Sequence, residues 1–189
     1  MADCRLTTLP GCELVIGGYP RFHYNAGGGQ ANGLSQAGTD EEHVLEFSAQ
    51  STSIPALNWR TTRFLGLPLP PGLSVAIRPV ALGGRYVPAS GELELDFQAC
   101  FRFRAGLARG LSITAPDLVV NTRLTTEAMQ SQRHQRQGRR LMGSQPGVLV
   151  GAALIEPTGE AWLDRFLGLP DEALAVLHCQ LSLEGRNCG

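Results

Sequence analysis

The sequence predicts a mainly β protein, an antiparallel β-sandwich or flattened β-barrel with one short C-terminal helix. Three observations lead to this prediction. Segment 91–104 alternates strictly between apolar and polar residues, which is the period of a half-buried strand. Other short strand-like segments follow one another between turns, in a chain with 23 Gly and 12 Pro. One segment, near 160–168, has apolar residues at helical spacing.

Size and charge narrow the classes of protein further. The 189 residues suit a single β-rich domain spanning 1–189. The net charge of -1 excludes a generally basic nucleic-acid binder, so no nucleic-acid partner is expected. The start of the chain has no apolar segment behind a basic one, and no apolar run reaches the length of a membrane-spanning helix. We therefore expect a soluble, cytoplasmic protein.

Segment 91–104 is the clearest strand. Its apolar side consists of Leu93, Leu95, Phe97, Ala99, Phe101 and Phe103. Its polar side is acidic first and basic afterwards, so an antiparallel neighbour with the reverse order of charges would gain cross-strand pairs.

The other strands are predicted from the same kind of pattern. Further predicted strands are 12–19 with a continuation through Phe22 and Tyr24, 43–49, 57–64, 73–82, 111–115, 118–125, 147–155 and 175–183. Segment 147–155 is apolar on both faces, which is typical of a strand covered on both sides. The helix begins after 157–160 and ends at Gly168 and Pro170, with 171–175 as a further turn.

Two polar segments are predicted to be mobile loops. Segment 26–42 is rich in glycine, and segment 126–140 is rich in arginine. The second could be a long hairpin tip or a frayed helix, and the residues do not decide between them.

The hexapeptide RFLGLP occurs twice, at 63–68 and 165–170. It can reflect an internal duplication or a common local solution, an amphipathic turn ended by Gly and Pro. The flanking sequences do not match, which favours the second interpretation. In both, we expect Phe64, Leu65, Phe166 and Leu167 to pack inward.

No motif specifies a reaction. The chain has no GxSxG serine, no phosphate-binding glycine loop and no histidines at ligand spacing. We therefore predict no catalytic residue, no cofactor and no metal. A zinc site from Cys4, Cys12, Cys179 and Cys188 would need the termini to meet, and the spacings are longer than those of structural zinc pairs.

The long apolar face of 91–104, in a chain poor in catalytic motifs, favours a non-catalytic binding module for a small apolar ligand such as a lipid or pigment. A filled core would give the same pattern. The predicted ligand-binding residues are Trp59, Phe97, Phe101, Phe103, Asn121 and Glu127.

Two alternatives remain. One is an assembly or scaffold protein that docks on a membrane-associated protein partner or membrane surface through an anion-binding loop. The arginines of that loop are Arg133, Arg136, Arg139 and Arg140. The other, ranked last, is an enzyme of unknown reaction with a pocket near His23, Tyr24 and Glu127.

Four stretches carry a resemblance to a known group of proteins. They are YPRFHYNAGGG at 19–29, FLGLPLPPGL at 64–73, LTTE at 124–127, and 151–169 with its EPTGEAWLDRFLGL. Together they resemble an uncharacterised conserved protein family of cyanobacteria and plastids. The resemblance brings no activity and no site residues, and it implies a cytosolic setting or one peripheral to the thylakoid membrane.

Overall fold

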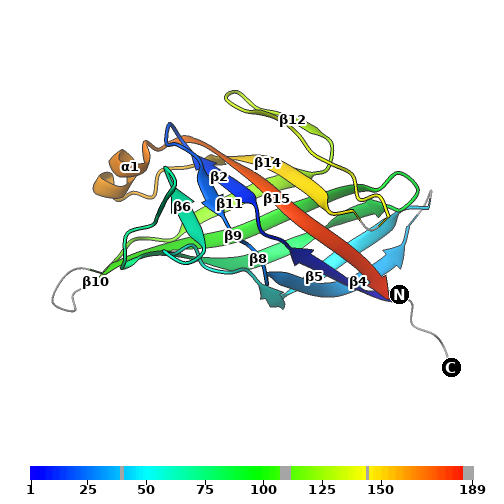
Figure 1. Cartoon of the computed structure of the whole chain (residues 1–189). Coiled ribbons are helices and arrows are strands. Elements are labelled where there is room, and N and C mark those ends of the chain that lie inside the picture. The colour runs from blue at the N-terminus through cyan, green and yellow to red at the C-terminus, as the bar shows by residue number, and fades with distance from the viewer. Residues whose placement is uncertain (39–40, 107–111, 144, 185–189) are drawn as a thin grey trace.

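Eight antiparallel strands close into a ring in the computed structural model, which describes residues 1–38, 41–106, 112–143 and 145–184 (Figure 1). In spatial order they are β1 (Ala2–Thr8), β4 (Gln30–Ala37), β5 (His43–Ser53), β8 (Leu73–Val87), β9 (Glu92–Gly106), β11 (Leu118–Thr125), β14 (Gly147–Ile155) and β15 (Asp171–Glu184). The ring closes because β1 pairs with β4 on one edge and with β15 on the other. A mainly β fold with one short helix, α1 (Ala161–Leu167), is thereby confirmed.

The alternation in β9 decides which face of the strand points into the ring. Leu93, Leu95 and Ala99 are fully buried inside it, while the charged residues between them face outward. On the outer face Glu94 lies between Arg85 of β8 and Arg123 of β11, with nitrogen–oxygen distances of 3.7 and 3.6 Å. The cross-strand charge pairs expected from the sequence are therefore present.

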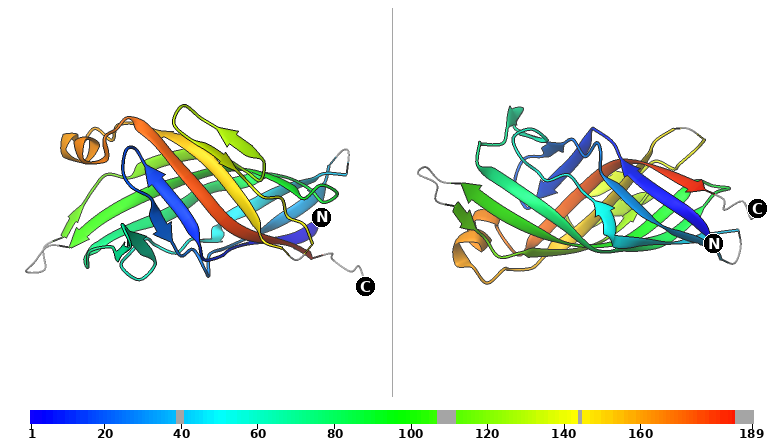
Figure 2. Two further views of the ribbon diagram at one scale, coloured as in Figure 1. Left: turned by 45° about the horizontal axis from the view of Figure 1, so that its top comes forward. Right: turned by 90° about the horizontal axis from the view of Figure 1, so that it is seen from below.

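A branch of short strands leaves the ring at β15. Beyond β1, the same edge of β15 pairs with β2 (Cys12–Ile16). The sheet then continues through β3 (Phe22–Tyr24), β6 (Thr62–Phe64) and β7 (Leu67–Pro68). Figure 2 shows that this branch and α1 lie at the same end of the ring. The smaller strands β10 (Ser112–Thr114), β12 (Ala128–Gln130) and β13 (Gln135–Gln137) complete the fold.

The two ends of the ring differ in packing. At the end where Asp3 pairs with Glu184, apolar side chains including Leu45, Phe47 and Leu149 form a filled core. At the other end, β5 and β8 are not paired. Their pairing covers only His43 to Phe47 of β5. There the chain at 54–70 covers the side of the ring, and the interior is hollow.

The predicted loop at 26–42 was wrong for 30–37, which forms β4 (residues 39–40 lie outside the described part). Gln, Asn, Gly and Ser are poor strand formers, which explains the error. The inward positions are small: Ala31 and Ser35 are buried, and Gly33 packs against Glu46 and Phe47 of β5. Period-two small residues were the signal that could have identified this strand.

One open alternative is decided, and two other predictions need correction. Segment 126–140 contains the β12–β13 hairpin, so the hairpin alternative holds and the frayed helix does not. Segment 57–64 is mostly a turn around Asn58, and only its last residues form β6. Segment 171–175 begins β15 and adds no helical turn. Position 111, at the start of the predicted strand 111–115, lies outside the described residues.

The two RFLGLP copies adopt different structures. In the first, Leu65 and Gly66 form the two-residue turn between β6 and β7, with φ of 53° and 79°. In the second, Leu167 ends α1 and Gly168 is its left-handed cap. Phe64 and Leu167 pack inward as expected. Leu65 and Phe166 are instead 69% and 58% exposed, and this part of the expectation was wrong.

Candidate functional site

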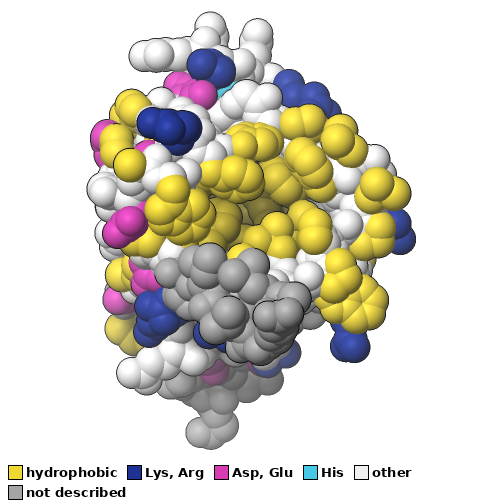
Figure 3. Space-filling model, turned by 90° about the vertical axis from the view of Figure 1, so that its left-hand side faces the viewer, with side chains coloured by type: hydrophobic (Ala, Val, Ile, Leu, Met, Phe, Trp, Pro, Cys, Tyr) yellow, Lys and Arg dark blue, Asp and Glu magenta, His cyan; other side chains and the backbone are white. Residues whose placement is uncertain are grey.

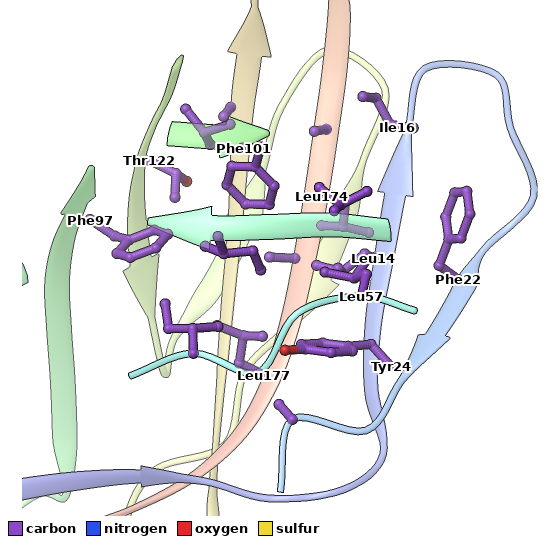
Figure 4. A pocket seen from close by; sticks show the side chains of 18 of the residues that line it. Leu14, Ile16, Phe22, Tyr24, Leu57, Phe97, Phe101, Thr122, Leu174 and Leu177 are labelled. Atoms are coloured by element: carbon purple, nitrogen blue, oxygen red, sulfur yellow. The ribbon is translucent and has the colours of Figure 1, made fainter. Parts of the chain in front are cut away.

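The hollow end of the ring forms a cavity of about 400 Å³. Viewed from the α1 end, apolar side chains surround the hollow (Figure 3). Its wall includes residues from every side of the ring and from the branch, as the close view shows (Figure 4). They include Leu14, Ile16, Phe22, Tyr24, Leu57, Leu73, Val75, Ile77, Phe97, Phe101, Phe103, Val120, Thr122, Leu149, Ala153, Phe166, Ala173, Ala175 and Leu177.

The cavity exists because large and small residues face each other across the ring. Strand β9 contributes Phe97, Phe101 and Phe103. Strands β14 and β15 contribute four small residues, Gly151, Ala153, Ala173 and Ala175. Gly151 and Ala175 are directly opposite each other in the register of the two strands. An eight-stranded ring is just wide enough for side chains to fill it, so a wall of small residues leaves space inside.

Three hydroxyl groups on the wall, those of Tyr24, Thr122 and Thr8, are already bonded to the backbone. The Tyr24 hydroxyl donates to the Pro55 carbonyl, and burial raises the pKa of this phenol. Thr122 Oγ1 donates to the Ala152 carbonyl at 2.9 Å, and Thr8 Oγ1 donates to the Ala26 carbonyl at 2.6 Å. Thr122 also links β11 to β14, where a single residue pair is in register. These groups therefore offer a ligand no free hydroxyl hydrogen.

The wall is also uncharged. Among the described residues that line the cavity there is no Asp, Glu, Arg or His. Cys179 lies at its inner end, where burial, followed by the influence of Cys12, raises the pKa of the thiol to about 12. The thiol is therefore protonated at neutral pH. A charged group placed inside would have no partner, and burying an unpaired charge is very costly.

The structure separates the residues predicted to bind a ligand. Phe97, Phe101 and Phe103 line the cavity. Trp59 lies outside it, half-exposed, with the Arg60 guanidinium 4.8 Å from the centre of its ring. Asn121 is exposed on the outer face of β11. Glu127 also lies outside the cavity and forms an ion pair with Arg140, which holds the pKa of its carboxyl below the usual range.

The residues of the proposed enzymatic pocket do not converge. Tyr24 faces the cavity, whereas its neighbour His23 is exposed and lies 4.0 Å from Glu13. Glu127 forms its ion pair with Arg140, in the chain that follows the β12–β13 hairpin. The geometry thus gives these three residues no shared site.

The four arginines of segment 126–140 are largely engaged within the protein. Arg133 pairs with Asp171 at 3.0 Å, and Arg140 pairs with Glu127. The side chains of Arg139 and Arg136 donate to the carbonyls of Pro146 and Gln135. Glu172 also accepts hydrogen bonds from Ser131, Gln132 and Arg133, which fixes the hairpin turn to β15 and lowers the pKa of the Glu172 carboxyl.

Several wall residues were not identified from the sequence. Leu57 and Ala175 line the cavity, whereas Tyr24 was named from the sequence only for the enzyme alternative. The alternation of small residues along β14 and β15 was visible, but nothing local shows that it faces the phenylalanines of β9.

In the described ranges no three His, Cys, Asp or Glu side chains form a group that could hold a metal. Cys188, one of the four cysteines considered for zinc, lies outside those ranges. No helix in the described part of the chain is long and apolar enough to cross a bilayer.

The chain was compared with known proteins at three levels. No family model, no curated protein and no solved structure matches it. The resemblance to a cyanobacterial and plastid family stays a prediction, and function has to be argued from the cavity itself.

Proposed function

We propose that this protein is a non-catalytic binding module that holds one small, predominantly hydrocarbon ligand, such as a lipid or pigment, inside its β-ring. The observation that carries the proposal is the cavity of about 400 Å³ whose wall is apolar and uncharged. This volume lies within the range of small-molecule sites in proteins. The absence of free hydroxyl donors on Tyr24, Thr122 and Thr8 favours recognition by shape and apolar contact.

The energetics of an unfilled cavity support this proposal. Voids in protein cores cost about 24 cal/mol per Å³. In this cavity of about 400 Å³, much of the apolar wall likewise has no packing partner. The closed ring of hydrogen bonds keeps the wall from collapsing. A ligand that fills the space would recover part of the lost contacts.

The wall also suggests how the ligand is oriented. The end near Leu45 and Phe47 is filled by the packed core, and the end near Phe166 is open to the surface. A polar or charged group would therefore stay at the open end in contact with water, while the hydrocarbon part occupies the interior.

The test is a titration with retinol, a neutral polyene whose fluorescence rises in apolar surroundings, followed by displacement with hexadecanol. The decisive variant is Ala175→Phe, which places a ring in the cavity. If the ring displaces three methylene groups of the ligand at about 0.8 kcal/mol each, affinity falls roughly fiftyfold. Because the ring enters empty space, the thermal midpoint should be unchanged or higher.

The matched control is Ala76→Phe, the same change on the exposed outer face of β8, which should leave affinity unchanged. The proposal fails if neither retinol nor hexadecanol binds saturably. It also fails if Ala175→Phe binds retinol as tightly as Ala76→Phe.

A further inference from the structure

The open end of the cavity carries a group of exposed apolar side chains, of which the ligand proposal uses only Phe166. Trp59, Leu65, Leu67, Trp162 and Phe166 are between 51 and 69% exposed; we call them the rim. They come from the 54–70 cover and from α1, which lie at the same end of the ring (Figures 1 and 2). Exposed large apolar side chains that gather at one place mark an interaction surface.

The chemistry of the rim matches a lipid–water interface. It contains both tryptophans of the chain, and tryptophan is the residue most typical of the headgroup region of a bilayer. Each tryptophan has a polar indole N–H and an apolar ring, so it can be wet on one side and buried on the other.

Basic side chains adjoin the rim. Arg60 and Arg165 directly neighbour rim residues in the sequence, and Arg63 is two positions before Leu65. All three arginines are exposed. Within the described part of the chain none of the three has an ion pair. The acid of α1, Asp164, is held by Thr158, whose N–H and hydroxyl lie 2.7 and 2.6 Å from its carboxylate. Two exposed acids, Glu156 and Glu160, precede the helix. The rim is therefore apolar, and the three exposed arginines beside it outnumber the two exposed acids that precede α1.

We infer that the rim docks on the surface of a bilayer that contains anionic lipids. A second copy of the chain fits the charges less well, because a two-fold contact between rims would bring the arginines of both copies together. Anionic headgroups instead complement Arg60, Arg63 and Arg165, and acyl chains accommodate Leu65 and Leu67.

Docking in this orientation has a consequence for the cavity. Phe166 belongs both to the rim and to the cavity wall, so the opening would face the acyl chains. A hydrocarbon ligand could then move between bilayer and cavity without crossing water. This transfer route rests on the proposed ligand-binding function, whereas the docking does not.

The test uses the full chain with two sets of vesicles, one of pure phosphatidylcholine and one of phosphatidylcholine mixed with phosphatidylglycerol. Because both tryptophans are in the rim, docking should shift their emission to the blue, and the protein should sediment with the mixed vesicles. The double substitution Leu65→Ser and Leu67→Ser should weaken this binding at least about tenfold. Its matched control is Leu34→Ser with Val44→Ser, two exposed apolar residues on β4 and β5, which should bind normally.

Charge is tested separately. Replacing Arg60, Arg63 and Arg165 together by Gln should weaken binding to the mixed vesicles on the order of a hundredfold. Binding to pure phosphatidylcholine should not change. Equal losses on both kinds of vesicle would overturn the assignment of the arginines to anionic headgroups.

The docking inference is overturned if the protein neither shifts its emission nor sediments with the mixed vesicles, or if the rim and control variants bind equally. Self-association that depends on Leu65 and Leu67, without vesicle binding, would assign the rim to a second copy. Retinol binding in buffer distinguishes the two proposals. Docking by a protein that does not bind retinol leaves this inference standing, and retinol binding without docking removes it.

Discussion

Leu57 and Val75 exchange both of their backbone hydrogen bonds, at 2.9 and 2.8 Å, and form an isolated bridge between the 54–70 cover and β8. This bridge lies where β5 has left β8 and the ring would otherwise be open at its side. Both side chains are buried and line the cavity. The bridge thus holds the cover over the cavity.

The first prediction concerns that bridge. Leu57→Ala should lower the free energy of unfolding by about 2 kcal/mol, because a buried side chain is lost from the cavity wall. Hydrogen exchange at the Val75 amide should become faster. Leu154→Ala, at an exposed leucine of β14, should stay within about 0.5 kcal/mol of the wild type. Unchanged exchange at Val75 would mean that the cover does not depend on Leu57.

The second prediction separates the two RFLGLP copies. Leu65 and Leu167 are the third residue of each copy, but Leu167, the last residue of α1, is buried and Leu65 is exposed. Leu167→Ala should cost about 2 to 4 kcal/mol in unfolding free energy. Leu65→Ala should change it by less than about 0.5 kcal/mol. Denaturant titration measures both, and similar losses would contradict the two conformations.

The third prediction concerns acid stability. Arg102 donates two hydrogen bonds to the Asp117 carboxylate, at 2.7 and 2.8 Å, and the first cause of the lowered pKa of Asp117 is this interaction. A carboxyl whose pKa is lowered by folding contributes stability above its unfolded pKa. That contribution is lost as pH falls through the lower, folded value.

Asp117→Asn should therefore lower the thermal midpoint at pH 7 and reduce its further fall below about pH 4. Some acid dependence remains, because the carboxyls of Glu127, Asp164 and Glu172 also have lowered pKa values. Asp96→Asn removes a more exposed, single-contact pair with Arg123 and should have a smaller effect at pH 7. Midpoints of wild type and Asp117→Asn that differ equally at all pH values would refute the linkage.

The fourth prediction tests why β4 contains a glycine. A Cβ at position 33 would lie 2.1 Å from the Glu46 carbonyl oxygen and 2.8 Å from the Phe47 Cα. Both are backbone atoms, so β4 and β5 would have to separate. Gly33→Ala should destabilise the protein by about 1 to 3 kcal/mol. Gly18→Ala, where a Cβ meets nothing within 4 Å, should be neutral, and equal effects at both sites would remove the packing explanation.

Much of the secondary structure could be predicted from the sequence, because strong local patterns agree with the final environment. The alternation of β9, the apolar run of β14 and the helix near 160–168 each place residues in the environment that their pattern indicates. Prediction failed at β4, because its small polar residues have low strand propensity and their period-two spacing is a weak signal. The strand is stabilised by its pairing with β1 and β5.

For the candidate site, less could be predicted from the sequence than for the secondary structure. The sequence by itself determined that Phe97, Phe101 and Phe103 share one face of a strand, because side chains on a strand alternate. Whether that face meets large side chains or small ones is a property of the opposite strand, and only the tertiary structure placed Gly151 and Ala175 across the ring. A filled core and a hollow ring have the same period along the chain, and they differ only in the volume enclosed when distant strands close.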